Sequence, residues 1–269
     1  MGALFIAFDS NFYFEKEEYY FIYQDITFKL LNSDGKNKHL LITIVDNHEI
    51  ETYKKVYETV SQFLSAFNWE HPYCKFLYKD ETFGVGASLP LDKLGRQLLS
   101  QKEMTAYIIK VDLPKKIPLI NDKKLKNVFA LFREANTASV NLELYEFFCY
   151  WKIFEFIHRT NDPSEIIYDL IGNDFFQKKG FLSKGEALIH LKEKLRNALS
   201  HGCKTKIINP DNFDDIHSVK EINSQLKHKL RRHIDKNIKI ENYLHLFTLN
   251  QEYPIYMTEK EYLSVLYKN

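Results

Sequence analysis

The sequence predicts an α+β protein with three parts. We expect an N-terminal mixed α/β-meander domain over residues 1–120, an all-α helical bundle over residues 123–235, and a short mixed C-terminal tail over residues 236–269 that packs on either domain. The composition supports a folded chain, since 45% of its 269 residues are apolar and Gly and Pro number only 9 and 7. Short β-branched and aromatic runs fill the first part. From residue 123 the apolar residues recur at helical spacing instead.

Strands are expected in the N-terminal domain wherever β-branched or aromatic runs lie between polar or turn residues. The segment Asn32-Ser33-Asp34-Gly35 is the clearest turn, so the strands around it are expected to form a meander. Asp46 is expected to cap a helix, because apolar residues recur at helical spacing from Ile50 to Phe67. The expected strands cover residues 3–8, 19–23, 26–31, 40–45, 73–78 and 105–111.

Residues 113–122 carry Pro114 and Pro118 and are expected to link the two domains. In the bundle, the segment 141–159 is apolar on nearly every side, which predicts a central helix. Gly172 and Gly180 are expected to bracket a loop. Further helices are expected from residue 123 to Thr137 or Ser139, from 162 to about 171, over 184–202 and from 213 to about 235. The tail is expected to hold a strand over 243–249 and a helix over 259–266.

The composition excludes several classes of protein. Lys+Arg number 37 and Asp+Glu 36, so the net charge of +1 indicates no acidic partner. Cys74, Cys149 and Cys203 have neither metal-site spacing nor an even number for disulfides, which favours a reducing compartment. Residues 1–8 lack the basic start of a signal peptide, and no stretch is long and uncharged enough to span a membrane. We therefore expect a cytoplasmic protein that needs no membrane, metal or cofactor.

The most informative stretch is residues 184–202, which read K-G-E-A-L-I-H-L-K-E-K-L-R-N-A-L-S-H-G. On an α-helical wheel of about 100° per residue, its apolar side chains fall within one arc typical of a core-facing stripe. Arg196, Asn197, Ser200 and His201 fall outside that arc and are expected to face outward together. An ordinary solvated face is the alternative interpretation. The stripe consists of Leu188, Leu191, Leu195, Ala198 and Leu199.

The string Arg196-Asn197-x-x-x-His201-Gly202 resembles the R-x4-6-H motif of the HEPN superfamily, in which Asn commonly follows the Arg. Two upstream segments, Phe132-Arg133-Glu134-Ala135 and Tyr150-Trp151-Lys152-Ile153-Phe154-Glu155, extend the resemblance. The order and spacing of the three segments are similar to those of the ApeA-like and MauJ-like HEPN subgroup. The resemblance covers roughly residues 123–235 and leaves the role of the N-terminal domain open.

The resemblance implies a metal-independent endoribonuclease, either a toxin or an antiviral abortive-infection effector, in which Arg196 and His201 carry the activity. It also implies a homodimer formed through the motif helix, which would bring a second imidazole near the first. The side chains suit this chemistry, since an imidazole can act as base or acid and a guanidinium matches phosphate oxygens. Asn197 can orient the His201 ring. The N-terminal domain would sense a trigger or shape the substrate site, and an unknown trigger or antitoxin is an expected partner besides RNA.

Several residues are candidates for RNA-binding or supporting roles. Ser200 belongs to the motif face, and Lys204 and Lys206 lie in an expected basic loop. Between residues 192 and 239 there are 12 Lys and Arg against 6 Asp and Glu, an excess of six that suits nucleic acid and suits an ordinary solvated surface equally.

Two further candidates keep two interpretations each. His190 lies on nearly the same helical face as His201 and is expected either to contact RNA or to be an ordinary surface histidine. Glu155 is expected either to hold Arg196 across the bundle or to pair with Lys152 one helical turn away.

A second function remains open at this point, namely an inactive HEPN-fold dimer that binds RNA, a nucleotide or a protein partner. A metal-dependent hydrolase in the N-terminal half is disfavoured, because no cluster of ligands appears there. We expect His39, His48 and His71 to be structural or surface residues, and we expect neither an acid–base pair nor a nucleophile in this half.

Overall fold

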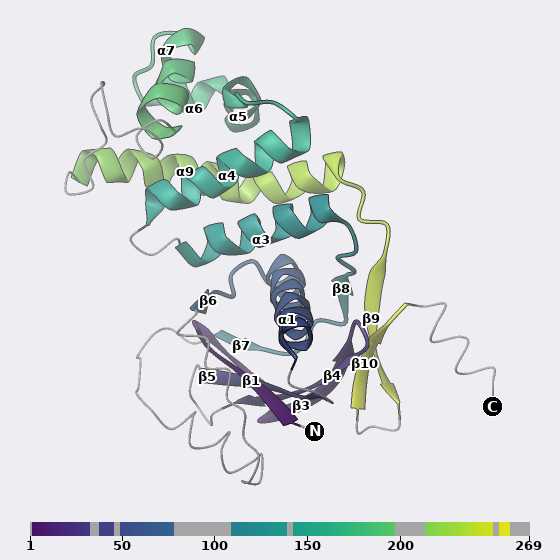
Figure 1. The fold of residues 1–269 in the computed structure, drawn as a ribbon. Helices are drawn as coiled ribbons and strands as arrows, with labels where there is room; N and C mark the ends of the chain where they lie inside the picture. The colour runs from purple at the N-terminus through teal and green to yellow at the C-terminus, as the bar shows by residue number, and fades with distance from the viewer. Residues whose placement is uncertain are drawn as a thin grey trace. The chain divides into compact units, whose positions relative to one another are not determined.

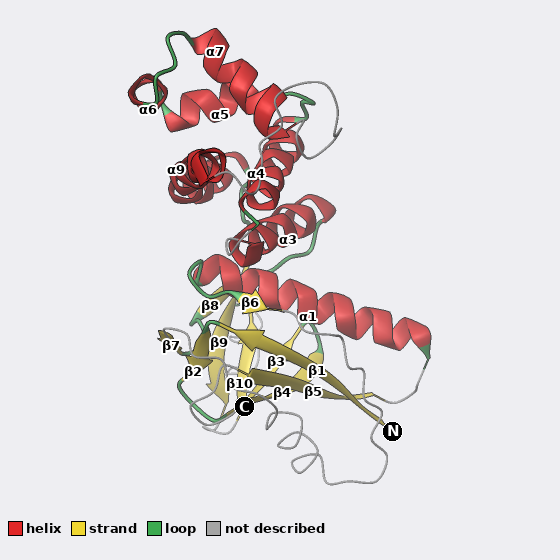
Figure 2. Cartoon of the chain, turned by 90° about the vertical axis from the view of Figure 1, so that its left-hand side faces the viewer, coloured by secondary structure: helices red, strands yellow, loops and turns green. Residues whose placement is uncertain are grey.

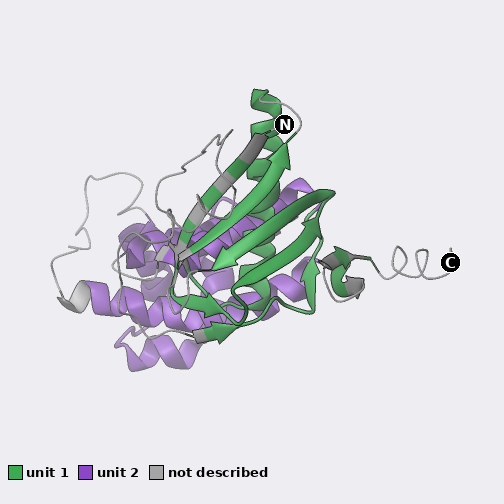
Figure 3. Ribbon diagram, turned by 90° about the horizontal axis from the view of Figure 1, so that it is seen from below, with its two compact units in different colours: residues 1–120, 241–269 green, residues 121–240 purple. Residues whose placement is uncertain are grey.

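The computed structural model of the protein describes residues 2–32, 38–45, 49–77, 109–138, 142–196, 213–249 and 253–258. The chain is α+β, as predicted, and forms two compact units (Figure 3). The first, called the sheet unit below, comprises residues 1–120 and 241–269. The second, called the helical unit, comprises residues 121–240.

An eight-stranded mixed sheet is the framework of the sheet unit, with the strand order β6-β1-β5-β4-β3-β10-β9-β8 (Figure 1). Neighbouring strands are antiparallel, except that β10 runs parallel to β3. A separate parallel pair joins β2 and β7. The strands are β1 (Gly2–Ser10), β2 (Phe12–Phe14), β3 (Glu18–Tyr23), β4 (Ile26–Asn32), β5 (Lys38–Val45), β6 (Phe76–Leu77), β7 (Ile109–Val111), β8 (Lys116–Pro118), β9 (Tyr243–Leu249) and β10 (Tyr253–Met257).

The structure corrects the expected linker. Part of residues 113–122 forms β8, which pairs with β9, and Ile117 and Ile120 are buried. The prolines misled the prediction, because β8 is the outermost strand of the sheet, where a proline is tolerated. The expected strand over 243–249 is present as β9. Of the expected turn over 32–35, only Asn32 is described, as the last residue of β4; residues 33–35 and the expected helix over 259–266 lie outside the described residues.

One long helix, α1 (Ile50–Glu70), lies along the sheet (Figure 2) and packs on it through aromatic side chains. Phe63 stacks on Phe21 of β3 with ring centroids 4.6 Å apart, and Phe67 stacks on Phe12 of β2 at 5.6 Å. All four rings are at most 1% exposed, so this contact is the core of the sheet unit. Asp46, the expected cap, lies outside the described residues; the helix begins at Ile50, and Glu49 before it makes no side-chain cap hydrogen bond.

The helical unit is built around α4 (Glu143–His158), whose Tyr150, Trp151 and Phe154 are at most 1% exposed. This helix packs against α3, α9 and η1, which agrees with the predicted central helix. The other helices are α3 (Lys123–Ala138), α5 (Ser164–Ile171), α6 (Asn173–Lys178), α7 (Lys184–Ile189), the π-helix η1 (His190–Arg196) and α9 (Phe213–Asn237).

The loop expected between Gly172 and Gly180 instead contains the short helix α6, whose Phe176 is buried. Both glycines have positive φ angles, 98° and 84°, a conformation that a residue with a Cβ rarely adopts. They therefore mark the two ends of a helix rather than the ends of a loop. Among the residues that the structure describes, no helix is long and apolar enough to cross a membrane.

Candidate functional site

The motif helix begins at Lys184, as the sequence predicts, with Ser183 as its N-cap. The Ser183 hydroxyl accepts a hydrogen bond from the backbone N–H of Glu186 at 3.2 Å, and the Glu186 carboxylate accepts one from the backbone N–H of Leu182 at 2.8 Å. These bonds satisfy donors that a helix start leaves unpaired. The helix continues through α7 directly into η1.

The expected helical wheel is wrong from His190 to Arg196, because this stretch is a π-helix. Each N–H of a π-helix bonds five residues back rather than four, so each residue turns less than 100° about the axis. The inward face still contains Leu191 and Leu195, both at 0% exposure. Ala187 is also fully buried, whereas Leu188 of the expected stripe is only half-buried.

Arg196 is the last residue of η1 and is half-buried, directly after the fully buried Leu195. It is the only member of the predicted catalytic trio within the described residues. Asn197 and His201, together with the supporting residues Ser200, Lys204 and Lys206, lie outside the described residues.

Glu155 adopts the second of its two expected arrangements and pairs with Lys152. Its Oε2 lies 2.6 Å from Lys152 Nζ, and its Oε1 accepts a hydrogen bond from Trp151 Nε1 at 2.9 Å. Both carboxylate oxygens are therefore used on α4 itself. This pairing fixes the buried indole of Trp151, which is a structural role.

His190 is half-buried, with its ring centroid 5.1 Å from that of Phe181. The outward orientation expected for it followed from the α-helical wheel, which η1 does not obey. The ring therefore packs against the segment before α7 and is not simply a free surface histidine, and its expected contact with RNA stays a prediction.

The sequence of α9 places a basic cluster outside its apolar stripe, and the structure uses several of these residues for packing. The expected cluster consists of Lys227, His228, Lys229, Arg231, Arg232 and His233. Lys229 donates a hydrogen bond to the Ile171 carbonyl at 2.7 Å. Burial lowers the pKa of Lys227. Of the expected cluster, only His228 and Arg232 are exposed. The basic surface of this helix is therefore smaller than its sequence predicts.

His233 of the same helix forms a histidine pair with His158 of α4. Their Nε2 atoms lie 2.7 Å apart and their ring centroids 5.0 Å apart. Burial lowers the pKa of both rings, and Lys124 adds to this effect at His158, as His158 and Lys236 do at His233. Two neutral rings can share one Nε2 proton, so this pair is a hydrogen bond between helices that is sensitive to acid.

The sheet unit contains a chain of hydrogen bonds that the sequence did not predict. His39 Nε2 lies 2.7 Å from Ser10 Oγ, and His39 Nδ1 lies 2.8 Å from Asn32 Oδ1. The Asn32 amide nitrogen donates to the Lys16 carbonyl at 2.6 Å, so its oxygen faces the histidine. His39 Nδ1–H donates to this oxygen, and the Ser10 hydroxyl donates to the Phe12 carbonyl oxygen at 2.5 Å, which also lies 3.2 Å from His39 Nε2.

A nucleophile, a base and an orienting group have this connectivity in serine hydrolases. The surroundings do not suit catalysis, however, because Ser10 and His39 are both 0% exposed and aromatic rings such as Phe8 and Phe12 surround the imidazole. Burial lowers the pKa of His39 to about 3, which makes it a weak base. We therefore interpret these hydrogen bonds as a buried structural network. Its signal in the sequence was only a histidine within an apolar strand.

Metal and thiol sites are also absent from the described part of the chain. Its histidines, cysteines and carboxylates form no group of three or more that could hold a metal ion. Cys74 and Cys149 are buried free thiols, and burial raises the pKa of each to about 12. Neither is a nucleophile near neutral pH. Comparison with family models, with curated proteins and with solved structures gives no match to this chain.

Proposed function

We propose that the helical unit is a metal-independent endoribonuclease of the HEPN type, with Arg196, His201 and Asn197 as its working residues. The observation that carries the proposal is the position of Arg196, the first residue of the motif, at the end of a π-helical segment. Such segments are rare and are frequent at functional sites. Leu191 and Leu195 bury one side of this segment in the core, whereas Arg196, which follows them, is half-buried.

The helix that carries the motif makes two further contacts, one at its start and one in η1. Ser183 caps its start, and Lys192 Nζ lies 2.8 Å from Asp162 Oδ2 in the segment before α5. A rigid support matters because catalytic groups must stay within a fraction of an ångström of their working geometry. The end of η1 therefore suits a site better than a surface loop would.

The reaction follows from the side chains. A base removes the proton of a ribose 2′-OH, and the 2′-oxygen attacks the adjacent phosphorus. The bond from phosphorus to the 5′-oxygen then breaks, and an acid protonates the leaving oxygen. The products end in a 2′,3′-cyclic phosphate and a 5′-OH. In this scheme Arg196 steadies the charge on the phosphorane, and His201 residues from two subunits act as base and acid.

The test compares the wild-type chain with Arg196→Ala and His201→Ala in an RNA cleavage assay that contains EDTA. We expect cyclic-phosphate ends from the wild type and a loss of at least 100-fold in each variant, as is typical of general acid–base groups (~10²–10⁴). Lys194→Ala is the matched control, because Lys194 is an exposed cation of the same segment. Cleavage that survives in both variants would rule out the proposed site.

The same preparations separate the proposal from an inactive binding dimer. Light scattering after gel filtration gives the oligomeric state, and fluorescence anisotropy with a labelled RNA gives binding. A wild-type dimer that binds RNA without cutting it in vitro, and that does not arrest growth when expressed in bacteria, would support the binding protein instead.

A further inference from the structure

The sheet unit contains an opening within its main sheet, between β4 and β5. The two strands pair only from Asn32 with His39 to Lys29 with Ile42. Beyond the Lys29–Ile42 pair, each of the two strands is paired only with the strand on its other side. Residues 26–28 of β4 stay paired with β3, and residues 43–45 of β5 stay paired with β1. Two strand edges therefore diverge inside a continuous sheet, which leaves main-chain donors and acceptors on both sides of the gap.

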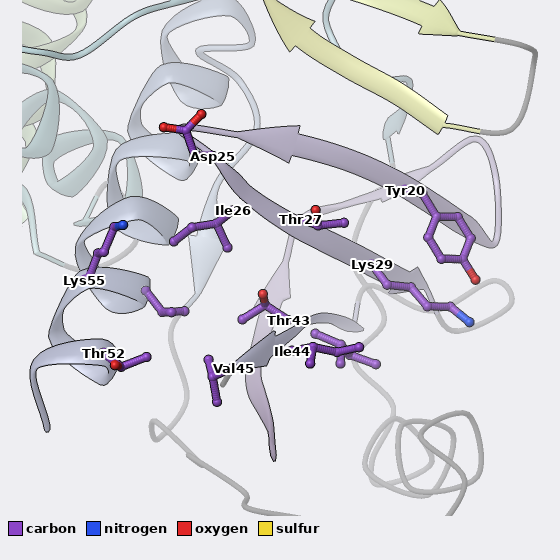
Figure 4. Close-up of a pocket in the computed structure, with 12 residues that line it drawn as sticks. Tyr20, Asp25, Ile26, Thr27, Lys29, Thr43, Ile44, Val45, Thr52 and Lys55 are labelled. Carbon is purple, nitrogen blue, oxygen red and sulfur yellow. The ribbon is translucent and has the colours of Figure 1, made fainter. Parts of the chain in front are cut away.

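A cavity of about 860 Å³ occupies this opening and reaches the first turns of α1 (Figure 4). Pockets that hold small organic ligands have roughly 300–1,000 Å³. Figure 4 shows Ile26, Thr43 and Val45 in the space between β4, β5 and α1. Five of the twelve lining residues are aliphatic, and threonine hydroxyls and strand-edge amides supply hydrogen-bonding groups.

The charged groups that line the cavity are Lys29, Lys55 and Asp25. Lys29 Nζ already lies 3.4 Å from Glu18 Oε2. Lys55 comes from α1, is exposed, and forms no ion pair within the described residues. The Asp25 carboxylate lies at the β3–β4 turn, and in Figure 4 it points away from Thr43 and Val45. Lys55 is therefore the cation available to a bound group.

We propose that this opening binds an amphipathic small molecule, with an apolar ring or chain between β4 and β5 and one oxygen-rich anionic group at Lys55. The aliphatic walls favour the apolar body, because it is removed from water there. The ammonium, the threonine hydroxyls and the strand-edge N–H groups all donate hydrogen bonds, so they favour a carboxylate, sulfonate or phosphate head. This site is separate in sequence and in chemistry from the proposed nuclease motif.

Two fluorescent dyes that differ by one charge test the proposal on the full chain. The first is 8-anilinonaphthalene-1-sulfonate, and the second is N-phenyl-1-naphthylamine, which lacks the sulfonate. We expect each dye to bind one site per chain, and we expect the two dyes to compete. Lys55→Gln should weaken the sulfonate about fivefold, the size of one exposed ionic contact, and leave the uncharged dye unchanged.

The matched control is Lys54→Gln, because Lys54 is the neighbouring exposed lysine of α1 and does not line the cavity. It should change neither dye. Thr27→Trp places a large side chain in the opening from an exposed position and should weaken both dyes at least tenfold. Circular dichroism checks its folding, and the lysine variants test the site independently of it.

Binding of both dyes that is unchanged in folded Thr27→Trp, or the lack of a single saturable site, would overturn the proposal. Equal effects of Lys54→Gln and Lys55→Gln on the sulfonate would overturn the assignment of the anionic head. Neither result depends on RNA cleavage.

Discussion

His39 of the sheet unit and the His158–His233 pair of the helical unit lie in opposite environments. In the sheet unit His39 is completely buried and hydrogen-bonded to Ser10 and Asn32. In the helical unit His158 and His233 are only half-buried and bond to each other across two helices. The first arrangement has the connectivity of a catalytic triad and no access for a substrate, whereas the second keeps contact with solvent. Connectivity alone therefore does not identify a site, and exposure must be considered with it.

The chain allows this contrast to be measured one unit at a time. Its two tryptophans are divided between the units, with Trp69 in α1 and Trp151 in α4, and both are 1% exposed. A Trp151→Phe background therefore reports the unfolding of the sheet unit by fluorescence. A Trp69→Phe background reports the helical unit in the same way.

The largest effect is expected from removing His39. His39→Leu removes the imidazole that contacts the fully buried Ser10 hydroxyl and the half-buried Asn32 amide oxygen, so the sheet unit should lose about 2–4 kcal/mol of stability. His233→Leu should cost the helical unit about 1 kcal/mol or less, because water can reach a half-buried partner. Urea unfolding in the two tryptophan backgrounds measures both changes. Equal losses in the two units would contradict the distinction between a sealed and an open environment.

Acid should likewise destabilise the sheet unit more than the helical unit. Burial lowers the pKa of His39 to about 3, whereas a histidine in the unfolded chain has a pKa near 6.5. As the pH falls below 6.5, the unfolded state takes up a proton that the folded state refuses, so stability is lost. Between pH 6.5 and 4.5 the loss from this residue is about 2–3 kcal/mol, at ~1.4 kcal/mol per pH unit.

Carboxylates also titrate in this range, so the His39→Leu variant is the control that isolates the histidine. Its sheet unit should lose stability less steeply with falling pH than the wild type does. The pKa values of His158 and His233 are lowered as well, which gives the helical unit a slope of the same sign. That slope should be smaller because both rings are partly solvated. A steeper slope in the helical unit would contradict the expected order.

The sequence predicted the elements that depend on neighbouring residues, in both units, and missed those that depend on distant ones. Local periodicity placed α1, α4 and β9 well, because an apolar pattern at one spacing is a property of neighbouring residues. It missed β8, which carries Pro118 and exists because β9, far away in the sequence, pairs with it. It also missed the bond between Ser10 and His39, which are 29 residues apart.

The motif helix shows a subtler limit. The apolar stripe correctly indicated that Leu191 and Leu195 face the core. The wheel assumed α-helical geometry, and the change to a π-helix at His190 altered which side chains face outward. Glu155 likewise had two expected partners, Arg196 and Lys152, which its position in the sequence fitted equally well. In the structure its carboxylate contacts Lys152 and Trp151.

The smallest expected effects concern the starts of α7 in the helical unit and α1 in the sheet unit. Of these two helices, α7 has a side-chain cap and α1 has none. Ser183 caps α7 with its hydroxyl, so Ser183→Ala should cost the helical unit about 1 kcal/mol. The residue before α1 is Glu49, which has the extended backbone of a cap and makes no side-chain cap hydrogen bond. Glu49→Ser should therefore stabilise the sheet unit by about 0.5–1 kcal/mol. Urea midpoints in the tryptophan backgrounds measure both shifts, and shifts of the same sign would mean that capping does not distinguish these two helix starts.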